Sequence, residues 1–529
     1  MSTSKVCCNP DSSMPSEQVD AGAGAESAHA TVCLTRRRFL ATTAAAGAAL
    51  AFVRYTPSAY AATATDDFIN LSATGAARLI REKQISAVEA VTLCYARIDA
   101  VNPKLNAVVA FCRERALAEA AEADAQLAAG KSLGPLHGVP FTVKDSFDTA
   151  GVVSTGGTLG RKAFVPGQDA TVVARARAAG AILLGKTNTP EFTLGGGARG
   201  TYNLIYGQTY NPYNTAYSPA GSSGGAGAIV AAGGAFFDIG SDYGGSIRGP
   251  ANVNGIAGIK PTLGRVPRTG HIVGYGGAFD SFQETGPLTR RVEDLVLLLP
   301  ILNGPDGWDA AMAPVPLGDP AQVNLKKLRV AYYTSNGVTD PTPEIQALVK
   351  QCANYFSTLG CKVTKDMPPK MKELSDVRAK FSAANGREHM RRLLKLHGTT
   401  QASPGIRLDG EELPSADFTR LCEEMDALKS EQLAWFERYD LIVCPANAKP
   451  PERIPPEFVR VPGTLGLSYT SQYNTTGWPA GVVRAGTSTD AAGLPLGIQV
   501  VAQPWRDDVV LAALAHIESQ TGGWQKTSL

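Results

Sequence analysis

The sequence has almost no excess of charge of either sign. Its 50 lysine and arginine residues stand against 48 aspartate and glutamate residues, which leaves a formal net charge of +2 over 529 residues. No basic block occurs beyond the N-terminal region, so the composition gives no support to binding of nucleic acid or acidic surfaces. With 44% hydrophobic and 19% charged residues, the chain has a globular composition and enough length for a large core.

Closely spaced cysteine pairs are also missing. None of the nine cysteines forms a CxxC pair, which argues against a zinc site. Three of the nine lie within the first 33 residues, and we expect the other six to be free thiols. A disulfide between Cys352 and Cys361 is the alternative in an oxidising compartment.

No apolar run in the N-terminal region is long enough to cross a bilayer. The Ala-rich stretch 40–53 is too short and ends at Arg54. It follows the sequence TRRRFL at 35–40, typical of a twin-arginine export motif, and precedes the small-residue sequence AYA at 59–61. We therefore predict a cleaved export signal at 1–61 and a periplasmic or secreted protein that uses the bacterial export machinery. A chance arginine triplet in a disordered tail is the alternative.

Residues 62–529 read as one α/β domain, with no internal repeat. Charged amphipathic helices dominate about 306–439, which we interpret as a variable helical insertion. Asp169 is expected to cap the third predicted helix. The predicted helices cover residues 72–99 (with Ser86 a cap for 87–99), 113–129, 170–179, 221–232, 288–303, 342–359 and 419–439. The predicted strands cover residues 136–145, 181–184, 329–333, 441–444 and 495–501.

One motif points to a different chemistry. Residues 180–187, GAILLGKT, satisfy the P-loop pattern GxxxxGK[ST]. A P-loop runs from a strand through a glycine loop into a helix, so that its amides hold phosphate. Here the four middle residues are apolar and make the strand itself, after a helix that ends at Gly180. This reversed order argues against an ATPase.

A glycine-rich turn is the first candidate site. Residues 240–248, GSDYGGSIR, pack three glycines and two serines into nine positions after the apolar run 226–239. Consecutive turn amides can point into one concavity and hold a negative charge, so Ser246 would stand beside an anion-binding nest. A nucleophile beside an oxyanion hole is what acyl transfer needs. Taken alone, a glycine-rich loop without chemistry is the simpler interpretation.

Two further polar residues stand in suggestive contexts. Ser222 lies in the sequence AGSSGGA at 220–226, where it could serve merely as a helix N-cap. Lys144 ends the apolar run 136–145, and a lysine at a strand end is usually a solvated charge. A buried lysine, however, loses its charge readily and can then act as a base.

These residues belong to a set of motifs that resembles the amidase signature hydrolases. The resemblance covers roughly 72–304 and 440–517, and the segment 306–439 carries no motif that matches. The matching motifs are GVPFTVKD at 138–145, GKTNTPEF at 185–192, AGSSGGAGA at 220–228, GSDYGGSIRGPA at 240–251, GIKPT at 258–262, GPLTRRVEDL at 286–295, TGWPAGVV at 476–483 and GLPLGIQVV at 493–501.

The resemblance implies a fold and a catalytic triad. The fold would be a central mixed twisted β-sheet covered on both faces by helices. Ser246 matches the family's nucleophile, Ser222 the bridging serine that follows a cis peptide bond, and Lys144 the base. The resemblance also assigns the oxyanion hole to the amides of Tyr243, Gly244, Gly245 and Ser246, and support of the loop to Asp242 and Arg248. Ala220 replaces a usual glycine, and Tyr243 replaces a usual small or β-branched residue.

The implied activity is hydrolysis of a carboxylic amide to acid and amine or ammonia through an acyl-enzyme, without a metal or organic cofactor. The substrate would be a small-molecule amide, with aliphatic, aryl, peptide-like and carbamate types left open. The loop 193–206 and parts of 306–439 are the expected pocket walls. Homodimers are common in the family.

The alternatives are a glutaminase-type subunit of a tRNA-dependent amidotransferase and a catalytically inactive scaffold. The relay needs no histidine, and we expect ordinary surface or core roles for His137, His271, His389, His397 and His516.

Overall fold

The computed structural model describes residues 67–194, 196–275, 277–459 and 468–529. The export signal predicted at 1–61 lies outside these residues. In the described part, no helix is both long and apolar enough to cross a membrane.

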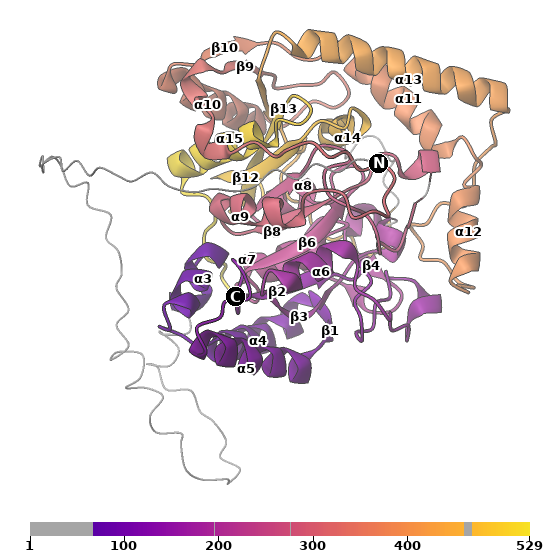
Figure 1. The fold of residues 1–529 in the computed structure, drawn as a ribbon. Coiled ribbons are helices and arrows are strands. Elements are labelled where there is room, and N and C mark those ends of the chain that lie inside the picture. The colour runs from indigo at the N-terminus through magenta and orange to yellow at the C-terminus, as the bar shows by residue number, and fades with distance from the viewer. Residues whose placement is uncertain (1–66, 195, 276, 460–467) are drawn as a thin grey trace, which may run out of the picture. The chain divides into compact units, whose positions relative to one another are not determined.

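An eleven-stranded mixed sheet organises the described residues, in the order β1-β3-β2-β6-β8-β7-β12-β13-β11-β9-β10. Strands β3, β2 and β6 run parallel in the first half, β11, β9 and β10 run parallel at the far edge, and the pairs between them are antiparallel. This arrangement, flanked by helices in Figure 1, confirms the predicted α/β class. The strands are β1 Val108–Phe111, β2 Pro140–Lys144, β3 Ile182–Thr187, β6 Phe237–Asp242, β7 Ala257–Lys260, β8 Glu284–Thr289, β9 Arg329–Tyr332, β10 Lys362–Lys365, β11 Leu441–Pro445, β12 Ala480–Thr487 and β13 Pro495–Ala502, with β4 Tyr202–Asn203 and β5 Gly207–Gln208 paired separately.

The helices cover the sheet through small or apolar faces. Helix α8 and helix α15 pack on β12 and β13, and α7 packs on β6 and β8. The helix α7 sequence, GGAGAIVA, is buried along its whole length, and its small residues let it approach the sheet closely. The helices are α3 Ala73–Arg81, α4 Ala87–Leu105, α5 Arg113–Ala128, α6 Thr171–Ala178, α7 Gly224–Ala231, α8 Arg248–Val253, α9 Val292–Leu302, α10 Pro343–Leu359, α11 Met371–Ala383, α12 Glu388–Leu396, α13 Ser415–Phe436, α14 Ser468–Thr475 and α15 Asp507–Thr521.

Helix ends were predicted best where a cap residue marks them. Ser86 caps α4 through a capping box with Glu89, which separates this helix from α3. Gly130 and Gly180 follow α5 and α6 with φ of +77° and +94°, the left-handed conformation that glycine tolerates. The first predicted helix, 72–99, is therefore two helices, and the second of them continues to Leu105.

Two expected features are wrong. Asp169 does not cap α6, because its carboxylate accepts hydrogen bonds from the Ala150 amide at 2.8 Å and from Arg177 at 2.5 Å. Leu288, placed in a helix by the sequence, lies in β8, and α9 begins four residues later. Because every residue of β8 is buried, the strand has no alternating pattern that would separate it from the helix that follows.

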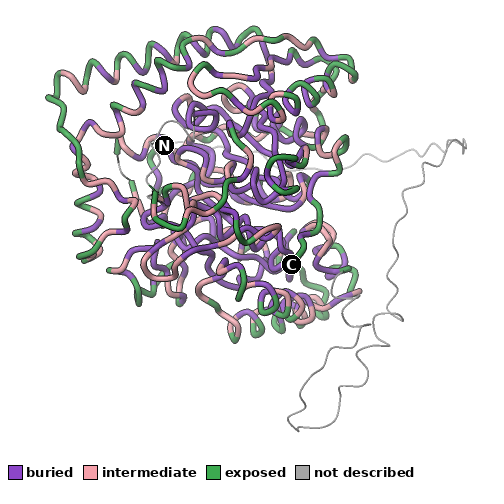
Figure 2. Tube along the Cα trace, turned by 180° about the vertical axis from the view of Figure 1, so that it is seen from behind, coloured by how far each residue is buried: buried purple, intermediate pink, exposed green. Residues whose placement is uncertain are grey.

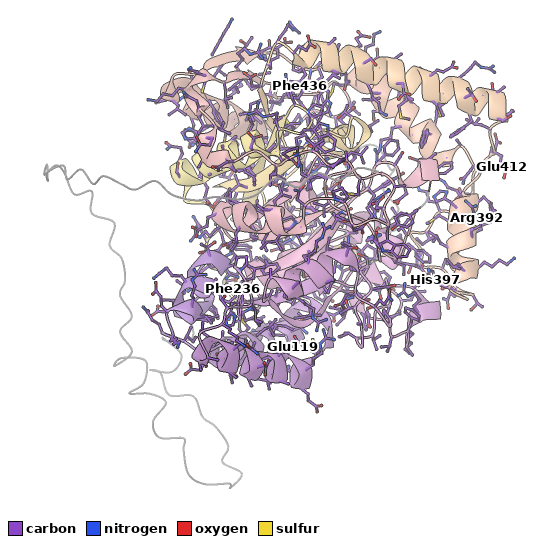
Figure 3. All side chains as sticks on the ribbon, in the orientation of Figure 1. Glu119, Phe236, Arg392, His397, Glu412 and Phe436 are labelled. Carbon is purple, nitrogen blue, oxygen red and sulfur yellow. The ribbon has the colours of Figure 1, made fainter. Side chains whose placement is uncertain are left out.

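The segment 306–439 contributes to the sheet as well as to helices. Strands β9 and β10 extend the sheet edge next to β11, while α11 and α13 pack together. Figure 1 shows α11, α12 and α13 in orange on one side of this region. In Figure 3 the labelled Arg392 and His397 mark α12 and the residue that follows it, and Glu412 marks the approach to α13.

The centre of the sheet is buried on both faces. Every residue of β2, β3, β6 and β8 is buried, and the rings of Phe141 and Phe237 stack at 4.9 Å between β2 and β6. Figure 2 shows the buried trace gathered in this interior, with exposed residues along the outer helices. Polar side chains at the ends of these central strands are therefore buried among the neighbouring strands and helices.

Candidate active site

Lys144 is the last residue of β2 and is completely buried. Its Nζ lies 2.6 Å from Ser222 Oγ and 3.0 Å from Ser241 Oγ. Burial lowers the pKa of Lys144 to about 7, although the carboxylates of Asp242 and Asp238 act to raise it. At neutral pH a large fraction of this lysine is therefore uncharged and able to accept a proton.

Ser222 follows a cis peptide bond, Gly221–Ser222, as the motif resemblance implied. The alternative role as a helix N-cap is not realised, because Ser223 precedes α7 and makes no side-chain cap bond. Ser222 is instead buried with its hydroxyl against Lys144. Ala220 has φ of +57°, the conformation that explains why glycine is usual at its position.

Ser246 lies in the turn between β6 and α8 and is partly exposed. Its carbonyl accepts a hydrogen bond from the Ser223 amide at 3.2 Å, so the two serine-containing loops are joined beside Lys144. The side chains of Lys144 and Ser222 are buried, whereas Ser246 is partly exposed and can be reached from outside. This order suits a buried base, a bridging hydroxyl and an accessible nucleophile.

The carboxylate of Asp242 organises the turn that holds Ser246. It accepts hydrogen bonds from the amides of Gly245 at 2.6 Å, Ile247 at 3.1 Å and Arg248 at 3.3 Å. The Gly245 amide, expected in the oxyanion hole, is thus engaged by Asp242. Among the described residues, no group accepts a hydrogen bond from the amides of Tyr243, Gly244 or Ser246.

Arg248 forms a fully buried ion pair with Asp242, at 3.0 Å. Burial alone would raise the pKa of Asp242, but the charge of Arg248 and the surrounding hydrogen bonds lower it below its ordinary value. The guanidinium also donates to Gln499 Oε1 at 2.8 Å and to Asn474 Oδ1 at 2.5 Å. Asp242 and Arg248 therefore tie the turn to α14 and β13, in line with their expected supporting role.

A glycine is required at position 245. Its φ is +133°, and a Cβ added there would lie 2.3 Å from Thr470 Oγ1 of α14. The Thr470 hydroxyl donates to the Gly244 carbonyl at 2.6 Å, so α14 lies directly against the turn. A side chain at position 245 would separate these two elements.

His271 lies behind Lys144, a position that the sequence analysis missed. Its Nε2 is 3.1 Å from Ser241 Oγ, and its Nδ1 is 2.7 Å from Gln283 Nε2. Burial, followed by the charges of Lys144 and Arg268, lowers the pKa of His271 well below its ordinary value. No motif around residue 271 signals this contact, because Lys144 and Ser241 come from distant strands.

The P-loop-like sequence has no phosphate-binding geometry. Helix α6, Gly180 and β3 follow one another in the order helix, turn, strand, as predicted. The buried Lys186 of β3 donates to the Phe147 carbonyl and, at 3.0 Å each, to the hydroxyls of Thr149 and Ser154. This lysine anchors the loop that follows β2.

In the described part of the chain, no three histidine, cysteine, aspartate or glutamate side chains are grouped as metal ligands. The six cysteines after residue 61 are free thiols. The expectation of six free thiols is therefore confirmed, and the alternative disulfide between Cys352 and Cys361 is not formed.

The chain is similar to known proteins in both sequence and structure. A family model described as Amidase matches residues 89–511. An acylamidase of Rhodococcus erythropolis is 34% identical over 467 residues, 85% of this chain and 95% of that protein. A glutamyl-tRNA(Gln) amidotransferase subunit of Picosynechococcus sp. is 32% identical over 481 residues, 84% of this chain and 96% of that protein. The structure of 6-aminohexanoate cyclic dimer hydrolase has a TM-score of 0.77 at 28% identity, covering 87% of this chain and 99% of that chain.

Proposed function

This chain belongs to the amidase family, and we propose that Ser246, Ser222 and Lys144 form the catalytic triad with which it hydrolyses amide C–N bonds. The observation that carries the proposal is the 2.6 Å contact between the buried Lys144 Nζ and Ser222 Oγ. A lysine whose pKa burial lowers to about 7 can draw a proton from that hydroxyl near neutral pH.

The order of proton transfers and bond changes follows from this arrangement. Neutral Lys144 accepts the Ser222 proton as Ser222 accepts the Ser246 proton, and Ser246 Oγ bonds to the amide carbon. The C–N bond then breaks as the proton returns through Ser222 to the leaving nitrogen. Water, deprotonated through the same relay, attacks the acyl-enzyme ester and releases the acid and Ser246. Side chains and backbone amides supply every group in this scheme.

The oxyanion of each tetrahedral intermediate is stabilised by the amides of Tyr243, Gly244 and Ser246. These three amides have no acceptor in the described structure, whereas the Gly245 amide is bonded to Asp242. Loss of one such donor typically lowers kcat by about 10² to 10³. The Gly245 amide acts indirectly, because its bond to Asp242 fixes the turn.

A fluorophosphonate probe tests the proposal without knowledge of the natural substrate. Attack by Ser246 forms an O–P bond and expels fluoride, which adds a fixed mass to the protein. One adduct on the wild type, none on Ser246→Ala and one on the control Ser281→Ala would support the assignment. Labelling of Ser246→Ala, or no labelling of the wild type, would contradict it.

The substrate we propose is a small-molecule carboxylic amide. The support is similarity over nearly the full length of an acylamidase and of a hydrolase of a cyclic amide dimer. The amidotransferase relative, which is 32% identical, keeps a glutaminase role as the second candidate. Release of ammonia from glutamine, measured beside a panel of acyl amides and anilides, separates the two.

We also propose that residues 1–61 direct export through the twin-arginine route and that the mature protein works in the periplasm or outside the cell. The support is the arginine pair, the short apolar stretch and the small-residue site read from the sequence. A reporter fused to residues 1–61 should be exported by cells with that route and retained when Arg36 and Arg37 are replaced by lysine. Retention of the unaltered fusion would reject the signal.

A homodimer is proposed on the family resemblance alone. Light scattering of the mature protein during gel filtration would give its mass directly. A monomer mass at micromolar concentration would reject the dimer.

A further inference from the structure

Three consecutive carbonyl groups of the turn before Ser246 are each held by a side chain from outside the turn. Two of the donors come from α14, and the third comes from α11 in the segment 306–439, which carries no family motif. The pairs are Asn474 Nδ2 with the Asp242 carbonyl (2.8 Å), the Arg378 guanidinium with the Tyr243 carbonyl, and Thr470 Oγ1 with the Gly244 carbonyl (2.6 Å).

Holding a carbonyl also aims the next amide. A peptide group is planar and trans, so the carbonyl of one residue and the N–H of the next point in opposite directions. The side chain that fixes the Tyr243 carbonyl therefore fixes the direction of the Gly244 amide. In the described structure that side chain is Arg378, and the Gly244 amide is one of the three without an acceptor.

Arg378 is itself held firmly. Its Nη1 donates to Thr475 Oγ1 at 2.9 Å, and its guanidinium lies over the rings of Tyr243 at 5.0 Å and Phe282 at 4.5 Å. Only 8% of the residue is exposed. Its position is thus set by packing in the protein without substrate, which is the condition for a preorganised oxyanion hole.

We propose that Arg378 is a positioning residue that aligns the oxyanion hole, an inference that rests on the function proposed above. Without it, the peptide group between Tyr243 and Gly244 can rotate. A rotated group turns a carbonyl oxygen, rather than an N–H, toward the developing negative charge, which repels it. Part of the catalytic power of this chain therefore comes from its segment 306–439.

The rate of fluorophosphonate labelling at Ser246 tests the proposal, because the phosphoryl oxygen occupies the oxyanion hole. In Arg378→Met we expect the maximal rate of inactivation to fall about tenfold to a hundredfold, with reversible binding of the probe unchanged. Millimolar guanidinium chloride should restore part of that rate. The control Arg391→Met removes an exposed guanidinium of α12, paired with Glu388, and should label like the wild type.

The outcomes separate this proposal from the one it rests on. A wild type that is not labelled, or Ser246→Ala that is, contradicts the triad itself. If the wild type is labelled and Arg378→Met is labelled at the same rate, the role of Arg378 alone is overturned. The same conclusion follows if Arg378→Met is labelled slowly, binds the probe more weakly and is not rescued by guanidinium. If thermal unfolding shows that Arg378→Met is not folded, Arg378→Lys decides. The lysine amine keeps the positive charge but lacks the two-pronged guanidinium that reaches both Tyr243 and Thr475. The labelling rate of Arg378→Lys should therefore be intermediate, and a rate equal to that of the wild type would overturn the positioning role of Arg378.

Discussion

His271 and Lys144 bind the same hydroxyl group, that of Ser241. The Ser241 oxygen lies 3.0 Å from Lys144 Nζ and 3.1 Å from His271 Nε2. A neutral amine has two N–H donors and one lone pair, and a hydroxyl has a single proton. The Gln283 amide and the Val273 N–H both donate to His271 Nδ1, so the neutral ring carries its proton on Nε2 and donates it to Ser241 Oγ. If Lys144 also donates an N–H to Ser241 Oγ, its lone pair is left facing Ser222. The histidine thereby holds the Ser241 hydroxyl against Lys144 without taking part in the relay.

Replacing His271 tests this role. In His271→Phe, Ser241 loses the N–H that holds its oxygen, so its hydroxyl can rotate and its proton can compete with that of Ser222 for the Lys144 lone pair. We expect kcat on an active amide to fall about tenfold, the effect of one hydrogen bond. The control is His516→Phe, a residue of α15 packed on Phe356. Equal kcat values for the two variants would remove His271 from the relay.

Activity should fall as the pH drops below about 7. Lys144 must be neutral to accept a proton, and its pKa lies at about 7, so protonation below that pH removes the base. The buried carboxylate of Asp238 raises this pKa, and Asp238→Asn should therefore move the midpoint of the acid limb to lower pH. The measurement is kcat/KM against pH for both proteins. If the fall in kcat/KM at acid pH disappears in Asp238→Asn, the group that titrates is Asp238 and not Lys144.

Removal of the base should abolish most of the activity while leaving the fold in place. In Lys144→Met a buried amine, with a pKa that burial lowers to about 7, becomes an apolar group of similar length, so the melting temperature above pH 7 should change little. We expect kcat to drop by about 10² to 10⁴, the usual contribution of general acid–base catalysis. Turnover like that of the wild type would exclude the relay through Lys144.

The buried pair of Asp242 and Arg248 should matter for stability, unlike ion pairs on the surface. Asp242→Asn leaves a buried guanidinium without its counter-charge, which costs about 3 to 5 kcal/mol. Asp417→Asn breaks the exposed pair with Arg420 and should cost less than about 1 kcal/mol. Urea unfolding of both variants measures the difference. Similar losses would mean that the turn does not depend on this pair.

Gly245→Ala should inactivate the protein by displacing the turn. The added Cβ meets Thr470 Oγ1 at 2.3 Å, in addition to the strain of its positive φ. Gly274 also has a positive φ, of +65°, but has no atom within 4 Å of an added Cβ, so Gly274→Ala isolates the strain alone. Fluorophosphonate labelling should be lost in the first variant and kept in the second. Comparable labelling would show that the contact with α14 is dispensable.

The residues proposed as the triad could be predicted because each lies in a contiguous motif. Lys144, Ser222 and Ser246 stand in short glycine-rich or strand-end sequences whose local geometry is fixed by neighbouring residues. Their supporting partners have no such signature. His271 and Arg378 are an ordinary histidine and an ordinary helical arginine in the sequence, and only the fold brings them to the site.

The errors in the fold have a similar origin. Leu288 lies in β8, ETGPLT, whose six residues are all buried, so no alternation of exposed and buried residues separates this strand from a helix. Asp169 has the right residue type for a cap, yet Arg177 competes for its carboxylate from within the same helix. Long-range pairing likewise brought β10 into the sheet, although its four residues are partly exposed and carry no strong strand signal.

The bonds of Arg248 to Asn474 and Gln499 have a consequence for how the protein is made. All three residues of the proposed triad are synthesised within the first half of the chain, but the partners that hold their turn in place emerge near its end. A growing polypeptide carries its serine nucleophile long before that serine is aligned. The turn therefore gains these two partners only after residues 474 and 499 have been made.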